Sequence, residues 1–370
     1  MGRFCIAEMS SAYRKLFGPR WAAALALAVL QPALALAQGG SGGWMPIPPT
    51  RGRLVAADIG LVINSADPAS VQVGEHYMAV RKLAPSQVLR LELPLKPTLT
   101  REEFQRFSEA VSTHFGPRTQ ALALAWTAPY AVECQSITGA LALGFDPDFC
   151  KQSCSPSRPS RYFNSAVVRP LQELGFRPSM LLAARTVEEA KALIDRGAAS
   201  DRALALRGRP PVTAALLATD DAPRRVRMTL YPPAGLLRGV GVDVRVLPAA
   251  ELPEQRRVVM VSTGSVKAPV EPAPDWAPGG LGDHLTSYGG DLLGTHGHGT
   301  ALDWIASGAV ASYGTVSEPC NHVQKFPHPQ VLLGHYLQGE TAIEAYWKSV
   351  GWPLQGLFVG DPLAAPFARR

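Results

Sequence analysis

The residues best suited to chemistry gather near one short segment of the chain. Residues 318–322, Glu-Pro-Cys-Asn-His, place a carboxylate, a thiol, an amide and an imidazole side by side after an apolar run. A Cys320 thiolate could attack an acyl carbon while His298 or His284 supplies the proton for the leaving group. Without such catalysis, Glu318, Asn321 and His322 could still bind a ligand at the end of a strand. The segment therefore predicts a functional site.

Histidines also cluster in this part of the sequence, where six of the eight lie between residues 284 and 335. His296 and His298 form a His-x-His pair, and His298 stands in Gly297-His298-Gly299. Imidazoles can bind zinc, so these two are weak metal candidates, but spacing alone supplies no third ligand. No H-E-x-x-H motif is present. We therefore predict no metal or other cofactor, and an exposed glycine-rich loop is the alternative for this pair.

The cysteines carry a second prediction, because Cys134, Cys150, Cys154 and Cys320 form an even set. In an oxidising compartment an even number of cysteines favours disulfides, here two, with three pairings open. A free, reactive Cys320 is the alternative. The two predictions exclude each other, since a disulfide at Cys320 would remove the thiolate.

The N-terminus has the features of an export signal. A basic segment precedes the apolar run 21–36, and Ala35-Leu36-Ala37 is the small-x-small pattern of a signal peptidase site. We expect residues 1–37 to be a signal peptide, followed by a flexible lead-in over 38–51. The mature chain would then be periplasmic or extracellular, with no membrane span.

Charge and composition exclude several classes of protein. The chain is 46% hydrophobic and 18% charged, which argues against disorder. Removal of residues 1–37 takes away four basic residues and one acidic one, so the net charge of +6 falls to +3. This is too little to predict nucleic-acid binding. Arg224, Arg225 and Arg227 are expected to form a solvated charged face.

The elements that must position these residues alternate between strands and helices. Short apolar runs predict strands, and serine, threonine or acidic caps followed by one-sided apolar patterns predict helices between them. This alternation predicts an α/β fold with layered, mostly parallel sheets and flanking helices. We expect an N-terminal α/β domain over 52–205, a cysteine-stapled excursion within it at 127–178, and a C-terminal α/β domain over 206–370. The predicted strands are 58–64, 88–93, 122–126, 180–183, 214–218, 242–247, 257–262, 309–316 and 356–360, and the predicted capping pairs are Thr100/Glu103, Thr186/Glu189, Thr300/Asp303 and Thr341/Glu344.

The last hundred or so residues contain three motifs in a fixed order. Gly308-Ala309 opens a predicted strand, Gly339-x-Thr341-x-x-Glu344-Ala345 opens a helix, and Gly360-Asp361-Pro362 closes the domain. This tail resembles the end of the gingipain-type cysteine peptidases, which have a caspase-like fold. The resemblance implies a caspase/gingipain-like C-terminal half.

The same resemblance implies positions for a catalytic dyad at the ends of two neighbouring strands. The histidine would fall near Gly264-Ser265 and the cysteine near residues 284–287, where neither residue type stands in register. This predicts a pseudo-peptidase that binds a protein or peptide partner. The alternative is a cysteine peptidase-like hydrolase that uses Cys320 with His298 or His284, and a metal-dependent hydrolase ranks behind both.

A second resemblance covers nearly all of residues 52–370. The stretches 283–290, 318–321 and 344–349 are similar to an exported bacterial family of unknown function. This resemblance implies export and leaves the activity open.

Overall fold

The structure of the protein is a computed structural model that describes residues 43–205 and 210–369. The predicted signal peptide, residues 1–37, and the first part of the lead-in lie outside the described residues. Within the described ranges, no helix is long and apolar enough to cross a membrane. The strands are β1 Ile59–Asn64, β2 Val88–Leu91, β3 Thr98–Leu99, β4 Ala121–Leu124, β5 Ala131–Val132, β6 Gln135–Ser136, β7 Ser179–Leu181, β8 Val212–Ala218, β9 Gly235–Leu237, β10 Val242–Pro248, β11 Val258–Gly264, β12 Trp276–Leu285, β13 Ala311–Thr315 and β14 Gly356–Gly360. The helices are α3 Pro68–Arg81, α4 Arg101–His114, α5 Ile137–Leu143, α6 Pro170–Leu174, α7 Val187–Ser200, α8 Ala301–Ser307, α9 Pro329–Leu337 and α10 Ala342–Ser349.

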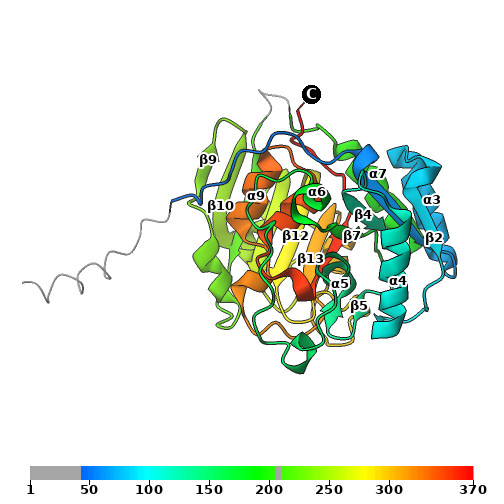
Figure 1. Cartoon of the computed structure of the whole chain (residues 1–370). Coiled ribbons are helices and arrows are strands. Elements are labelled where there is room, and N and C mark those ends of the chain that lie inside the picture. Colours follow the sequence, from blue (N-terminus) through cyan, green and yellow to red (C-terminus); the bar gives the residue numbers. More distant parts are fainter. Residues whose placement is uncertain (1–42, 206–209, 370) are drawn as a thin grey trace, which may run out of the picture. The chain divides into compact units, whose positions relative to one another are not determined.

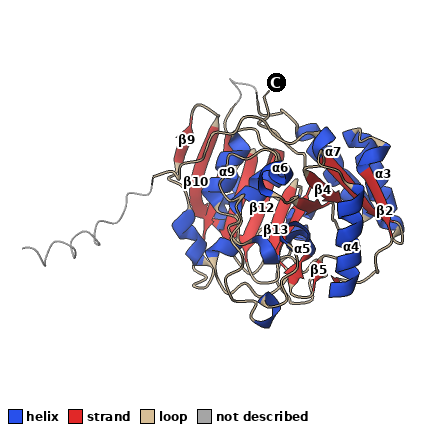
Figure 2. Cartoon of the chain, in the orientation of Figure 1, coloured by secondary structure: helices blue, strands red, loops and turns tan. Residues whose placement is uncertain are grey.

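Eleven of the described strands form one sheet, in the order β2-β1-β4-β7-β14-β13-β12-β11-β8-β10-β9 (Figure 1). Neighbours are parallel except at β13–β14 and at the edge pair β9–β10. The sheet therefore consists of two parallel halves that run in opposite directions and meet between β13 and β14. This confirms the predicted fold class of a layered, mostly parallel sheet with flanking helices, which lie on both sides of the strands in Figure 2.

Strands from both predicted domains belong to this one sheet. The last strand, β14, pairs with β7 on one side and with β13 on the other. The described residues from Trp44 on accordingly form one compact unit, and the expected boundary near residue 205 lies between two strands of the same sheet, β7 and β8.

Local signals account for several helix starts. Threonine capping boxes open α4, α8 and α10, as predicted. At α7, Thr186 Oγ1 accepts a hydrogen bond from the Glu189 backbone N–H, whereas the Glu189 carboxylate accepts one from the Arg185 N–H. That helix continues to Ser200.

The core lies on both faces of the central strands. Every residue of β1, β4, β11, β13 and β14 is buried. Such strands appear in the sequence as continuous apolar runs, because helices or loops cover both faces of a parallel sheet. The positions of the strand ends are therefore fixed by a large apolar interior.

The described part of the lead-in, from Trp44 on, has no helix or strand but is bound to α9. The Met45 N–H donates to Gln330 Oε1 at 2.6 Å, and the Thr50 N–H donates to Gln338 Oε1 at 2.8 Å. Gly334 of α9 allows the close approach, since a Cβ there would lie 2.5 Å from the Ile47 side chain. The lead-in thus crosses α9 in direct contact.

The excursion at 127–178 contains the short helices α5 and α6 and the strands β5 and β6, which form a small sheet with β3 in the order β3-β5-β6. Ser136 Oγ accepts the Gly139 N–H at the start of α5 and donates to the Gly356 carbonyl at the start of β14. These contacts hold the excursion beside the central strands.

Candidate functional site

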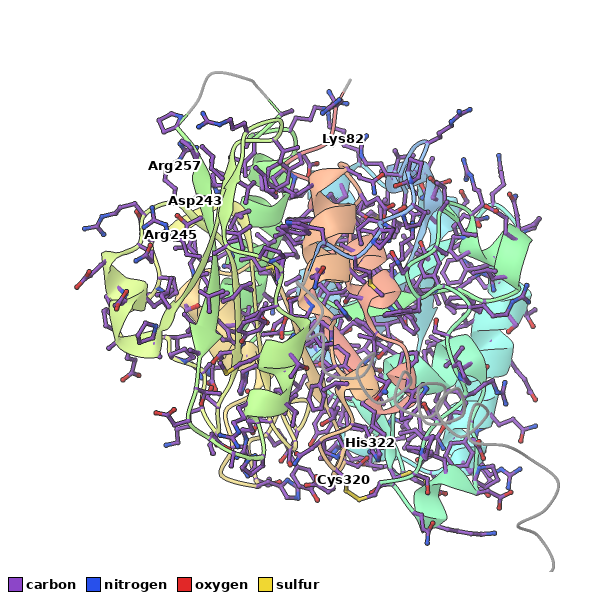
Figure 3. The ribbon with its side chains drawn as sticks, turned by 90° about the vertical axis from the view of Figure 1, so that its left-hand side faces the viewer. Lys82, Asp243, Arg245, Arg257, Cys320 and His322 are labelled. Carbon is purple, nitrogen blue, oxygen red and sulfur yellow. A yellow bond between two sulfur atoms is a disulfide. The ribbon has the colours of Figure 1, made fainter. Side chains whose placement is uncertain are left out.

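The candidate site lies at the carboxyl ends of several neighbouring strands. The strands β8, β11, β12 and β13 are parallel, so their carboxyl ends lie side by side at the same end of the sheet. The loops that follow them carry the residues singled out from the sequence. In α/β sheets, ligands commonly bind outside the carboxyl ends of the strands. Figure 3 shows Cys320 and His322 close together at this end of the molecule.

Cys320 is part of a disulfide. Its Sγ is bonded to Cys154, and Cys134 is bonded to Cys150. Of the three pairings that the sequence left open, the structure has this one. Both disulfides involve the excursion at 127–178, and the Cys154–Cys320 disulfide links it to the loop after β13. In this state Cys320 carries no thiol, and no described cysteine is free.

The strand ends at which the gingipain resemblance placed the dyad are now defined. Strand β11 ends at Gly264, and Ser265 follows, with its hydroxyl donating to the Lys267 carbonyl. The neighbouring parallel strand β12 ends at Leu285, and Thr286 and Ser287 follow. The two strands that the resemblance requires are therefore adjacent, with hydroxyl side chains at their ends.

His284 has both ring nitrogens engaged inside the fold. Its Nδ1 accepts a hydrogen bond from the Trp304 indole at 2.9 Å, and its Nε2–H donates to the Gly299 carbonyl at 3.2 Å. Burial lowers the pKa of His284 to about 3, so the ring is neutral. It offers no free nitrogen to a nucleophile, which is the behaviour of a core histidine that joins β12 to α8.

The loop 286–299, here called the histidine loop, is organised by Asp291. The Asp291 carboxylate is buried and accepts hydrogen bonds from Tyr130 Oη at 2.6 Å, from the backbone and hydroxyl of Thr295 at 2.8 and 2.6 Å, and from His296 Nδ1 at 2.7 Å. Burial alone would raise the pKa of Asp291, but these hydrogen bonds lower it to about 2. An ionised Asp291 therefore fixes the orientation of His296.

Two histidines of this loop lie around one tyrosine. The His296 ring stacks on Tyr288, with the ring centroids 3.8 Å apart, and the His298 ring meets Tyr288 edge-on at 6.3 Å. His298 Nδ1 hydrogen bonds to Thr286 Oγ1 at 2.9 Å. The side chain of His296 is 48% exposed. In both histidines the Nε2 atom has no partner within the described residues.

The segment 317–322, here called the cysteine corner, is held by polar contacts. The Cys320 N–H donates to Glu318 Oε1 at 2.8 Å, and Ser317 Oγ donates to the Cys134 carbonyl at 2.6 Å. Cys320 and Asn321 both have positive φ, near 55° and 57°, a conformation that L-residues seldom adopt in succession. Asn321 is exposed, and the His322 ring contacts Trp352 at 5.6 Å.

Segment 130–134 connects the histidine loop with the cysteine corner. Tyr130 donates to Asp291 in the loop, and the Cys134 carbonyl accepts from Ser317 in the corner. Segment 130–134 is far from Asp291 and Ser317 in the sequence, and the folded chain brings all three to the same ends of the strands. The spacing Asp291-x-x-x-Thr295-His296 is the one local signal from which the role of Asp291 could have been predicted.

A buried ion pair near these strand ends contradicts the prediction made for Arg227. Arg227 and Asp283 are each 1% exposed and form a salt bridge, and Arg227 also donates to the Pro327 carbonyl at 2.8 Å. Burial raises the pKa of Asp283, and the charge of Arg227 opposes that rise. The prediction that Arg227 belongs to a solvated face is wrong, because its guanidinium joins β12 to the loop before α9.

The described ranges contain no group of three or more histidine, cysteine, aspartate or glutamate side chains arranged to hold a metal ion. His296 and His298 lie on one loop, but one nitrogen of each is already bonded to Asp291 or Thr286.

No protein-family model matches the chain, and no curated protein matches it in sequence. The chain is similar to the crystal structure of the Arg-specific cysteine proteinase gingipain R, with a TM-score of 0.45 and 12% identity over 86% of this chain and 80% of that one. It is also similar to a structure described as a protease, with a TM-score of 0.41 and 9% identity over 85% of this chain and 79% of that one.

Proposed function

We propose that this protein is an exported pseudo-peptidase, a relative of the caspase/gingipain fold that binds a protein or peptide partner at the carboxyl-end edge of its sheet. One observation carries the proposal: Cys320 Sγ is bonded to Cys154. A thiolate is the nucleophile of a cysteine peptidase, and a disulfide sulfur cannot act as one. The two disulfides also support export, since such bridges persist in oxidising compartments.

The surface that we assign to the partner consists of Tyr288, Leu293, His296, His298 and His322, here called the strand-end surface. Leu293 is 56% exposed, and the three histidines present partly exposed rings. Tyrosine is enriched among the residues that contribute most to the binding energy of protein interfaces, which makes Tyr288 the expected anchor of this surface. The hydrogen bonds of Asp291 fix His296 before binding, which lowers the ordering cost of association.

Thiol titration of the mature protein tests the proposal directly. We expect the non-reduced, unfolded chain to contain no reactive thiol, because its four cysteines form two bridges. A library of peptides should then remain uncut by the wild type and by Cys320→Ala alike. Detection of a free thiol, together with peptide cleavage that Cys320→Ala abolishes, would establish the hydrolase alternative instead.

A matched pair of variants separates loss of the bridge from loss of a nucleophile. Cys154→Ala and Cys320→Ala both break the same disulfide, but only Cys154→Ala leaves a thiol at the cysteine corner. We expect neither variant to cut peptides. Cleavage by Cys154→Ala alone would mean that the corner is a latent thiol enzyme, and the pseudo-peptidase proposal would be abandoned.

Binding is tested by selecting displayed peptides against the mature protein. We expect the selected peptides to bind the wild type and to bind Tyr288→Ala and His322→Ala at least tenfold more weakly, a loss of about 1.4 kcal/mol each. Arg245→Gln, a surface change on β10 far from this edge in Figure 3, serves as the control. Peptides that bind all four proteins equally would show that the strand-end surface is not the site.

A further inference from the structure

A cavity lies at the opposite ends of the strands, in the half of the sheet that contains β8, β10 and β11. It has a volume of about 560 Å³ and opens at the amino ends of β8, β10 and β11, where Val212, Gly241 and Arg257 line it. The segment after β14 closes it through Phe367 and Arg369. Volumes of about 300–1,000 Å³ are typical of pockets for small ligands. Figure 3 shows Arg257 at one end of the molecule and Cys320 at the other.

The charge on the wall of this cavity has one sign. Arg238, Arg257 and Arg369 line it, and among the described lining residues there is no aspartate or glutamate. Arg257 donates through Nη1 to the Pro210 carbonyl, and its other guanidinium N–H groups have no partner among the described residues. The side chains of Arg238 and Arg369 have no hydrogen bond or ion pair within the described residues. Three guanidinium groups with free donors favour an anion.

The rest of the wall is mostly apolar. Leu204, Pro211, Leu236, Val240, Leu337 and Phe367 contribute to it. Leu236 is 43% exposed, so its side chain is accessible to a ligand in this cavity. An anion without an apolar part would leave these side chains in water.

We propose that this cavity binds a small amphiphilic anion, in which a carboxylate, sulfonate or phosphate is attached to an apolar chain or ring. The arginines would hold the anionic group through charge-assisted hydrogen bonds. The apolar body would lie against Leu236 and Phe367 and remove them from water. This inference is independent of the partner proposed for the strand-end surface, since the two sites lie at opposite ends of the strands.

A fluorescence titration with 1-anilinonaphthalene-8-sulfonate, an aromatic sulfonate, tests the proposal on the mature chain. We expect saturable binding that decanoate displaces and that inorganic phosphate displaces at least tenfold less effectively. Equal displacement by inorganic phosphate would overturn the amphiphile assignment. Absence of saturable binding would overturn the site itself.

Variants locate the ligand. We expect the double change Arg238→Gln and Arg369→Gln to weaken binding about a hundredfold, because each change removes a charged donor worth about a factor of ten. Leu236→Ser should weaken it through the apolar wall alone. Arg245→Gln removes a nearby charge that lies outside the lining and is paired with Asp243 instead, and it should bind as the wild type does. Melting temperatures check that each variant is folded, and wild-type affinity in the folded double variant would refute the proposal.

Discussion

Four ionisable side chains are buried together at α9 and α10, and they allow a quantitative prediction. His335, Glu340, Glu344 and Lys348 are each at most 1% exposed. Glu340 Oε1 accepts hydrogen bonds from His335 Nδ1 at 3.0 Å and from Lys348 Nζ at 2.9 Å. Glu344 Oε2 accepts from the backbone and hydroxyl of Thr341. Oε2 of Glu340 and Oε1 of Glu344 have no partner within the described residues.

The two carboxyl groups differ in their protonation. Burial, and then the negative charge of Glu340, raise the pKa of Glu344 to about 7. Burial would also raise the pKa of Glu340, but the hydrogen bond from His335 and the charge of Lys348 lower it. The folded protein therefore favours an ionised Glu340 beside a Glu344 that holds its proton up to neutral pH.

We predict that Glu344→Gln stabilises the protein above neutral pH. The pKa of Glu344 is higher in the folded chain than its ordinary value of 4.5, so its favourable contribution is complete below pH 4.5 and is lost as pH rises through 7. This rise corresponds to about 3 kcal/mol in the free energy of unfolding. Glutamine keeps an acceptor for Thr341 and has no proton to lose. The gain of the variant should therefore increase from pH 4.5 to pH 7 and stay constant above.

Urea denaturation at about pH 4.5, 6 and 8 measures this gain. Glu254→Gln, at an exposed glutamate, is the control and should change the free energy of unfolding by less than about 0.5 kcal/mol at every pH. A difference between Glu344→Gln and the wild type that does not depend on pH would refute the reasoning. The reasoning would also fail if the stability of Glu344→Gln relative to the wild type decreased as pH rises.

The buried ion pair and one glycine give two further predictions. Arg227→Met should lower the free energy of unfolding by about 3–5 kcal/mol because it leaves Asp283 buried and unpaired, and adding Asp283→Leu should restore much of the loss in urea denaturation. If the double variant is as unstable as the single one, the pair is not the cause. Gly314→Ala should abolish soluble folded protein, since a Cβ there would overlap the backbone of Gly289. Gly116→Ala, where a Cβ meets no atom within 4 Å, is the control, and equal yields would contradict the argument.

Local sequence patterns were sufficient to predict part of the fold. The caps at Thr100, Thr300 and Thr341 specify helix starts locally, and continuous apolar runs mark the buried parallel strands. Strand β12 was not predicted, because Pro278, Gly279 and Gly280 within it are typical of a turn. Helix α9 was missed because it is buried almost all round and lacks a polar face.

The candidate site depends on contacts that no local pattern contains. Cys154 and Cys320 are 166 residues apart, and their pairing follows only once the excursion has folded beside β13. Trp304 and Gly299 hydrogen bond to the two ring nitrogens of His284, and the sequence around His284 indicated neither partner. Sequence spacing could propose these residues but not their partners.

The position of β14 has a consequence for which strand edges are exposed during folding. This strand, residues 356–360, comes later in the sequence than every other described strand and lies between the two oppositely directed halves. Until it is in place, β7 and β13 each present an unpaired inner edge, the kind of edge that recruits strands from other molecules. A chain shortened at residue 355 should therefore aggregate as it folds, even though nearly all of its apolar residues remain.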